Sequence, residues 1–193
     1  MTFHLARFIS LAMLAGAAAG CASASSKFYT LESTATADGA PAASYTIEVG
    51  PVTVPASVDR SEFVVQVAPN RVDIDEFNRW AAPLNESIAR TVVGDLSVLL
   101  GTPDVAMAPV ANFKPTYRVT IAVQRFDSLP AQNVVVDAVW TVRKASAEPT
   151  AGRTLAREPV QDASFDALAA AHSRALARVS GDIAAAIRAA AAP

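Results

Sequence analysis

A short apolar run that ends at the only cysteine determines how much of this chain remains to fold. Residues Phe8 to Ala19 are apolar or small, Arg7 precedes them, and Cys21 follows two positions later. About 12 residues form a helix of roughly 18 Å, which is too short for the ~30 Å hydrocarbon core of a bilayer. The run is therefore typical of an export signal and not of a permanent membrane span.

The residues around the cysteine, Ala18-Ala19-Gly20-Cys21, are similar to a lipobox, in which a signal peptidase cuts before a lipid-modified cysteine. Leucine is commoner than Ala18 at its position. We expect cleavage between Gly20 and Cys21, and acyl chains on Cys21 that anchor the chain, since each buried CH₂ contributes about 0.8 kcal/mol. A plain secretory signal with Cys21 as a bystander is the alternative. The residue directly after the cysteine is Ala22 and not Asp. By resemblance to the enterobacterial sorting rule, this residue favours the periplasmic face of the outer membrane.

Removal of residues 1–20 would leave 193 − 20 = 173 residues, enough for one domain. Residues 21–44 are rich in Ala, Ser and Thr and are expected to form a lipidated flexible tether, and residues 45–193 a single domain. A net charge of −2 with no block of Lys and Arg argues against a nucleic-acid partner. One cysteine cannot form an internal disulfide or, with His4 and His172, a zinc site.

Apolar and polar residues alternate over 45–49, 63–67, 117–123 and 134–142, which is the period of half-buried strands. Residues 62–75 are expected to form a hairpin, because Pro69-Asn70 is a turn signal. The alternation fails at Arg125-Phe126, where we expect a bulge or a strand end. Pro159 indicates that a weaker strand over 153–160 lies at a sheet edge.

Two amphipathic helices are predicted. The first carries an apolar stripe of Trp80, Leu84, Ile88, Val92 and Leu96, with Asp95 largely off it; it starts near Ala82, has Pro83 in its first turn, and ends at Gly101. The second runs from Phe165 to beyond Ile187, with Ser164 as its N-cap. The order strands, helix, strands, helix predicts an α+β domain: a mostly antiparallel or mixed sheet with two long helices packed on one face.

Motifs that would support catalysis do not emerge. The chain has no Gly-x-Ser-x-Gly elbow and no glycine-rich phosphate loop. His172, on an apolar helix face, is interpreted as a packed histidine, with a general base or pH sensor as the alternative. Asp73, Asp75 and Glu76 lack the glycine and spacing of a calcium loop, and Trp80 and Trp140 are expected in the core. The sequence therefore predicts no enzyme and no cofactor other than the acyl lipid on Cys21.

Four segments in this order form a wider pattern: the Cys21 lipobox with Phe28-Tyr29-Thr30-Leu31, Ile47-Glu48-Val49-Gly50-Pro51-Val52 with Pro55, Trp80-Ala81-Ala82-Pro83-Leu84 with Ile88-Ala89-Arg90, and Ala170-Ala171-His172-Ser173-Arg174-Ala175-Leu176 with Asp182-Ile183-Ala184. Together they resemble the auxiliary lipoproteins of intermembrane lipid transporters, the paraquat-inducible PqiC type, also described as ABC-type transport auxiliary lipoproteins. Residues 125–133 and 148–152 do not align with that pattern.

The resemblance implies a non-enzymatic periplasmic component that docks an MCE-domain protein, whose assemblies form hydrophobic conduits from the inner membrane, and that maintains the outer-membrane barrier. It also implies a homo-oligomeric ring that would suit a tubular partner. Candidate contacts with a partner or lipid are Phe28, Tyr29, Leu31, Trp80, Pro83, Leu84 and His172, for each of which packing within the domain is the alternative. Two other functions stay open: a structural or assembly role in the envelope, and a periplasmic lipid carrier with its own cavity.

Overall fold

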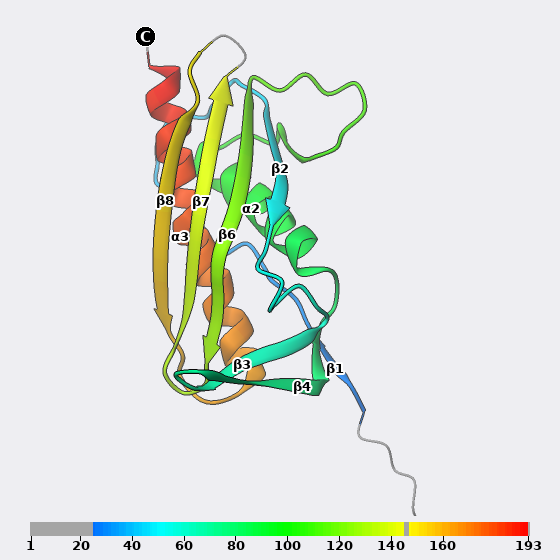
Figure 1. Ribbon diagram of the computed structural model, residues 1–193. Helices are drawn as coiled ribbons and strands as arrows, with labels where there is room; N and C mark the ends of the chain where they lie inside the picture. Colours follow the sequence, from blue (N-terminus) through cyan, green and yellow to red (C-terminus); the bar gives the residue numbers. More distant parts are fainter. Residues whose placement is uncertain (1–24, 145–146, 193) are drawn as a thin grey trace, which may run out of the picture.

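The computed structural model of the protein describes residues 25–144 and 147–192 (Figure 1). The predicted signal peptide and the cleavage site at Gly20 and Cys21 lie outside these residues. The strands are β1 (Lys27–Tyr29), β2 (Ile47–Thr53), β3 (Glu62–Ala68), β4 (Arg71–Trp80), β5 (Val105–Met107), β6 (Tyr117–Leu129), β7 (Asn133–Lys144) and β8 (Thr150–Pro159). The helices are α2 (Leu84–Leu100) and α3 (Phe165–Ala191).

The strands form two sheets. The large sheet has the order β5-β2-β6-β7-β8, in which β6, β7 and β8 are antiparallel and β2 runs parallel to β5 and β6. The small sheet has the order β1-β4-β3. Helices α2 and α3 lie side by side on one face of the large sheet (Figure 1). The α+β class and the helices on one face are confirmed, but the single sheet we expected is divided, because β4 pairs with β1 and β3 instead of extending the large sheet.

The helices begin and end as their chemistry requires. Ser164 Oγ accepts a hydrogen bond from Ala167 N at 3.1 Å and caps α3. Gly101, with φ at +62°, adopts the left-handed conformation that ends α2. The placement of Trp80 on this helix was wrong: Trp80 is the last residue of β4, where its N–H donates to the carbonyl of Ser61 at 2.6 Å. Pro83 precedes the first helical residue, Leu84.

Two irregularities interrupt the large sheet, one of them near the predicted position. The register of β6 against β7 shifts between Val123 and Arg125, which confirms the expected bulge. The register of β2 against β6 shifts between Val49 and Val52. Strand β8, as predicted, lies at the edge of its sheet. One irregularity thus lies in β6 and the other in β2, the strand that packs against α2.

Residues 30–43 form a segment that we call the N-terminal strap, and they contact the domain along their length. Leu31 is buried, Glu32 N donates to Ser173 Oγ at 3.1 Å, and Ala43 N donates to Leu100 O at 2.8 Å. The prediction of a flexible tether is wrong for these residues. Their composition offers few large apolar groups, but their backbone N–H groups find acceptors on both helices, and their small side chains allow a close approach.

Candidate functional site

Three of the predicted site residues meet in a buried aromatic cluster between the two sheets. The cluster consists of Tyr29, Phe63, Trp80, Phe126, Phe165 and His172. Trp80 stacks on Phe63 with ring centroids 4.1 Å apart, and it meets Phe126 edge-on at 6.0 Å. Because Phe63 and Trp80 belong to the small sheet and Phe126 to β6, the cluster fixes the small sheet onto the body of the domain.

Tyr29 and His172 occupy opposite sides of this cluster. Tyr29 donates its hydroxyl to Asn78 Oδ1 at 2.7 Å, which satisfies its polar end. His172 is fully buried and stacks on Phe126 with centroids 3.8 Å apart and rings 6° from parallel. Burial lowers the pKa of His172 from 6.5 to about 3, so its ring is neutral at ordinary pH. A sensor of neutral pH needs a pKa in that range, so packing is the interpretation that the geometry favours.

His172 does contact a hydroxyl in the geometry of a nucleophile and its base. Its Nε2 lies 2.8 Å from Ser128 Oγ. However, Ser128 is only 3% exposed and His172 not at all, so a substrate has no access to either atom. The Nδ1 atom of His172 has no hydrogen-bond partner within the described residues. No carboxylate there orients the ring as the aspartate of a catalytic triad does.

The segment that enters α2 divides its residues between core and surface. Leu84 is buried against the core cluster, whereas Pro83 is exposed. Both line a shallow hollow of about 360 Å³ together with Asp59 and the edge of Trp80. Leu84 is thus a packing residue, and Pro83 is the member of this segment that an external partner can touch.

The predicted island Phe28–Leu31 also alternates between inside and outside. Tyr29 and Leu31 are buried, and Phe28 is 64% exposed. An open groove of about 510 Å³ runs between this segment and α3, with Arg174 and Asp166 on its far side. A lipid carrier needs a closed apolar cavity, and this groove is open and partly charged.

Asp95 is the polar residue that sequence reasoning placed wrongly. We expected it off the apolar stripe of α2, yet it is fully buried. It accepts hydrogen bonds from Thr34 N at 3.0 Å, Ala35 N at 3.1 Å and Ser180 Oγ at 3.0 Å. The sequence signal for this burial was the position of Asp95 directly before Leu96 of the apolar stripe. A carboxylate that is buried beside such a stripe needs hydrogen-bond donors from other elements.

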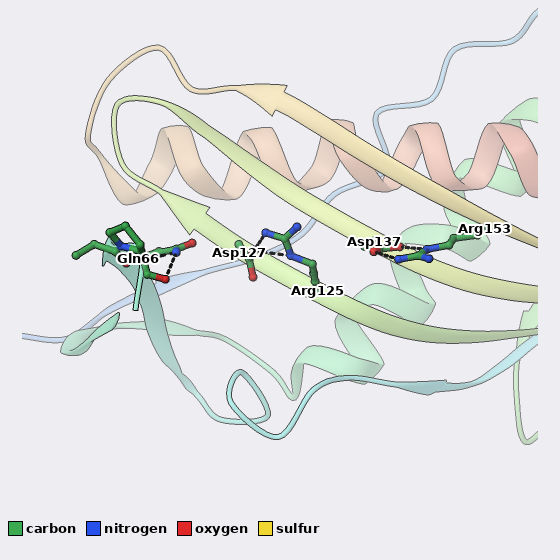
Figure 2. A network of polar contacts seen from close by, with 7 residues as sticks. Gln66, Arg125, Asp127, Asp137 and Arg153 are labelled. Carbon is green, nitrogen blue, oxygen red and sulfur yellow. Dashed lines mark hydrogen bonds and ion pairs between the residues drawn. The ribbon is translucent and has the colours of Figure 1, made fainter. Parts of the chain in front are cut away.

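The face of the large sheet that the helices leave open carries ion pairs. Arg153 donates two hydrogen bonds to Asp137, at 2.8 and 2.6 Å, which hold the pKa of that carboxyl below its ordinary value. Arg125 and Asp127 pair nearby on β6 (Figure 2). Asp137 lies on this outward face, but Arg153 shields it from water. This face is built for contact with water or with a polar partner.

The acidic residues of β4 serve the strand itself. Asp75 Oδ1 accepts hydrogen bonds from Phe77 N at 2.9 Å and Asn78 N at 2.8 Å. Burial acts to raise the pKa of Asp75, but the hydrogen bonds from Asn78 and Phe77 outweigh it and lower that pKa. In residues 25–144 and 147–192, no three His, Cys, Asp or Glu side chains are grouped as metal ligands would be.

No helix in the described part of the chain combines the length and the apolar character that a membrane span requires.

Two solved structures share this fold over most of the chain. One is a crystal structure of an uncharacterized protein, with a TM-score of 0.71 and 21% identity, covering 85% of this chain and 99% of that one. The other is protein XCC0632 from Xanthomonas campestris, of the family DUF330, with a TM-score of 0.70 and 19% identity, covering 82% and 93%. At these identities the likeness shows the fold alone. None of the curated proteins matches the chain.

The family is shown by the sequence itself. The model of the family described as ABC-type transport auxiliary lipoprotein component matches residues 29–184. The match begins at Tyr29, in the aromatic cluster, and includes the strap, both sheets and most of α3. The chain is therefore a member of the ABC-type transport auxiliary lipoprotein family.

Proposed function

We propose that this protein is a lipid-anchored, non-enzymatic component of an MCE-type intermembrane lipid transport system, held at the periplasmic face of the outer membrane. The observation that carries the proposal is the family match over residues 29–184, which starts eight residues after the lone cysteine of the lipobox. A transport auxiliary domain that follows an acylated Cys21 so closely works by its position at a membrane. The energy that drives transport would be supplied by other components of the system.

The described residues support a role in docking. The buried Ser128–His172 pair is closed to substrates, so the accessible chemistry lies on the surface. Two surfaces are candidates for the MCE-domain partner: the ion-paired open face of the large sheet and the hollow beside Pro83. A ring of copies would present either surface repeatedly around a tubular partner.

The anchor is tested by Cys21→Ser, with Ser23→Ala as the matched control. We expect Cys21→Ser to leave a soluble chain or an uncleaved precursor that takes up no fatty-acid probe, and Ser23→Ala to be labelled and to fractionate with the outer membrane. Normal outer-membrane fractionation of Cys21→Ser would contradict the anchor.

The partner is tested by cross-linking in cells and recovery of the acylated protein in mild detergent. We expect an MCE-domain protein to co-purify, and loss of the lipoprotein to weaken the outer-membrane barrier against apolar dyes. Recovery of an outer-membrane insertion machine in place of the MCE-domain protein would favour the assembly role. Bound lipid in the purified monomer would favour a carrier.

A further inference from the structure

One face of the small sheet turns away from the domain, and four of its seven side chains are apolar. Residues that pair in register share a face of a sheet. The pairs Val64–Ile74 and Gln66–Val72 lie on one face, and the buried Phe63 and Val65 lie on the other. Phe28 pairs with Arg79 and projects to the same side. The outer face of the small sheet consists of Phe28, Glu62, Val64, Gln66, Val72, Ile74 and Arg79.

The alternation of β4 is the reverse of what a water-exposed face requires. Val72 and Ile74 point outward and are 52% and 46% exposed, whereas Asp73 and Asp75 point to the opposite side. A sheet with water on one face normally puts its polar residues there. The charges on the outer face are Glu62 and Arg79, and these two form an ion pair with each other. The outer face thus has the composition of a surface that is covered.

The rest of the described surface does not share this character. Nine large apolar side chains are exposed among the described residues, and five of them lie in the small sheet: Phe28, Val72 and Ile74 on its outer face, and Val67 and Phe77 elsewhere in it. The open face of the large sheet instead carries the pairs Arg125–Asp127 and Arg153–Asp137 (Figure 2). An apolar patch this concentrated marks a contact with a partner or a membrane.

We propose that the outer face of the small sheet rests on the surface of the bilayer that holds the lipid of Cys21. The inference depends on the proposed anchor. Five residues separate Cys21 from Lys27, the first residue of β1, and the six steps from one Cα to the next span at most about 21 Å even in a fully extended chain. Because β1 is part of the small sheet, the anchor holds this sheet next to the bilayer, at the end of the molecule where α3 begins (Figure 1).

The shape of the domain agrees with this orientation. Strand β1 begins at the end of the molecule where the small sheet lies, and α3 ends at the opposite end (Figure 1). The strap then leads the chain away from the small sheet along the two helices, bound to them at Ser173 and Asp95. Apolar side chains at an interface insert about 5–10 Å into the boundary of headgroups and acyl chains. The docked domain stands upright on its small sheet.

The test places an environment-sensitive dye on the outer face of the small sheet. The mature acylated protein is reconstituted in vesicles of phosphatidylethanolamine and phosphatidylglycerol. Ile74→Cys carries the dye in one variant and Leu155→Cys in the control, since Leu155 is 53% exposed on the open face of the large sheet. Acylation blocks the native thiol, so the introduced cysteine alone is labelled. We expect a blue shift at position 74 and quenching by nitroxide-labelled lipid several-fold stronger than at position 155.

Each result separates the contact from the anchor. If the protein floats with the vesicles but dissolved iodide quenches the dye at position 74 as strongly as at position 155, the membrane contact is overturned and the anchor stays intact. A shielded label at position 74 that lipid-bound nitroxide does not reach means that a second copy covers the face, which also overturns it. A protein that does not float with vesicles overturns the anchor and the contact together. A second protein combines Val72→Glu and Ile74→Glu and carries the dye on Val64→Cys. It should remain folded and float with the vesicles, but nitroxide-labelled lipid should no longer quench the dye.

Discussion

Ser33 donates its hydroxyl to Asp95 Oδ1 at 2.7 Å, which joins the N-terminal strap to a helix 62 residues further along the chain. The amides of Thr34 and Ala35 donate to the same oxygen, and Ser180 of α3 donates to the other one. Four donors allow a carboxylate to be fully buried without a cationic partner. Asp95 therefore holds the strap and the two helices in one arrangement, and through the strap it fixes how the domain follows its anchor.

Replacement of Asp95 should release the strap. Asp95→Ala leaves the strap amides of Thr34 and Ala35 without their acceptor and removes one of the two acceptors of the buried Ser180 hydroxyl, and we expect a loss of about 3 kcal/mol in the free energy of unfolding. The amides of Thr34 and Ala35 should also exchange faster with solvent. Urea unfolding and hydrogen exchange measure the two effects. Asp73→Ala, at an exposed position, is the control, and equal stability of the two variants would contradict the role of Asp95.

Two helical glycines predict opposite responses to the same substitution. An alanine Cβ at position 94 would lie 2.9 Å from Ser33 Cβ, whereas one at position 181 would meet nothing within 4 Å. Alanine is favoured over glycine in a helix by about 1 kcal/mol, so Gly181→Ala should stabilise the protein by up to that amount. Gly94→Ala should lower the melting temperature, because the strap must move away. A gain in melting temperature for both variants would mean that the strap does not press on α2.

The sequence predicts well those parts of the fold that have a period. The stripe of α3 from Leu168 to Ile187 and the alternation of β6 follow from residue spacing, because both elements bury one face against a continuous core. The ends of the helices follow from Ser164 and Gly101. Trp80 was misassigned because its spacing from Leu84 fits a helix, while the contact that decides its conformation, with the carbonyl of Ser61, comes from another strand.

The strap and the small sheet could not be predicted in the same way. Residues 30–43 have no apolar period, and their position depends on Asp95 and Ser173, which are far away in sequence. Strand β1 has only three residues, too few to show an alternation. The exposed side of Val72 and Ile74 was equally hidden, because alternation predicts a strand and does not say which of its faces the core covers.

The apolar face of α3 predicts a large cost for truncation. Leu176 is 1% exposed and belongs to the core cluster, so Leu176→Ala removes buried contacts and leaves a cavity. We expect a loss of about 2–5 kcal/mol in the free energy of unfolding, measured with urea. Leu155→Ala deletes the same atoms from an exposed position and should change stability little. An unchanged midpoint for Leu176→Ala would contradict the burial of this face.

His172 predicts a dependence of stability on pH. Its pKa is 6.5 when exposed and about 3 in the folded protein, where burial disfavours the charged ring. As the pH falls below 6.5, the unfolded state binds a proton that the folded state does not bind, so stability that is complete above pH 6.5 is lost progressively towards pH 3. The loss is about 1.4 kcal/mol per pH unit for this one group.

The contribution of His172 is isolated by comparison with His172→Gln, which keeps a polar group near Ser128 and removes the titration. Carboxylates also titrate as the pH falls, but they are common to both proteins and cancel in the difference. Between pH 6.5 and pH 5 the native protein should therefore lose about 2 kcal/mol more than the variant, measured by urea unfolding at each pH. Parallel pH profiles would mean that His172 reaches solvent in the folded state and that the aromatic cluster, which joins the small sheet to the body, opens far more readily than its packing implies.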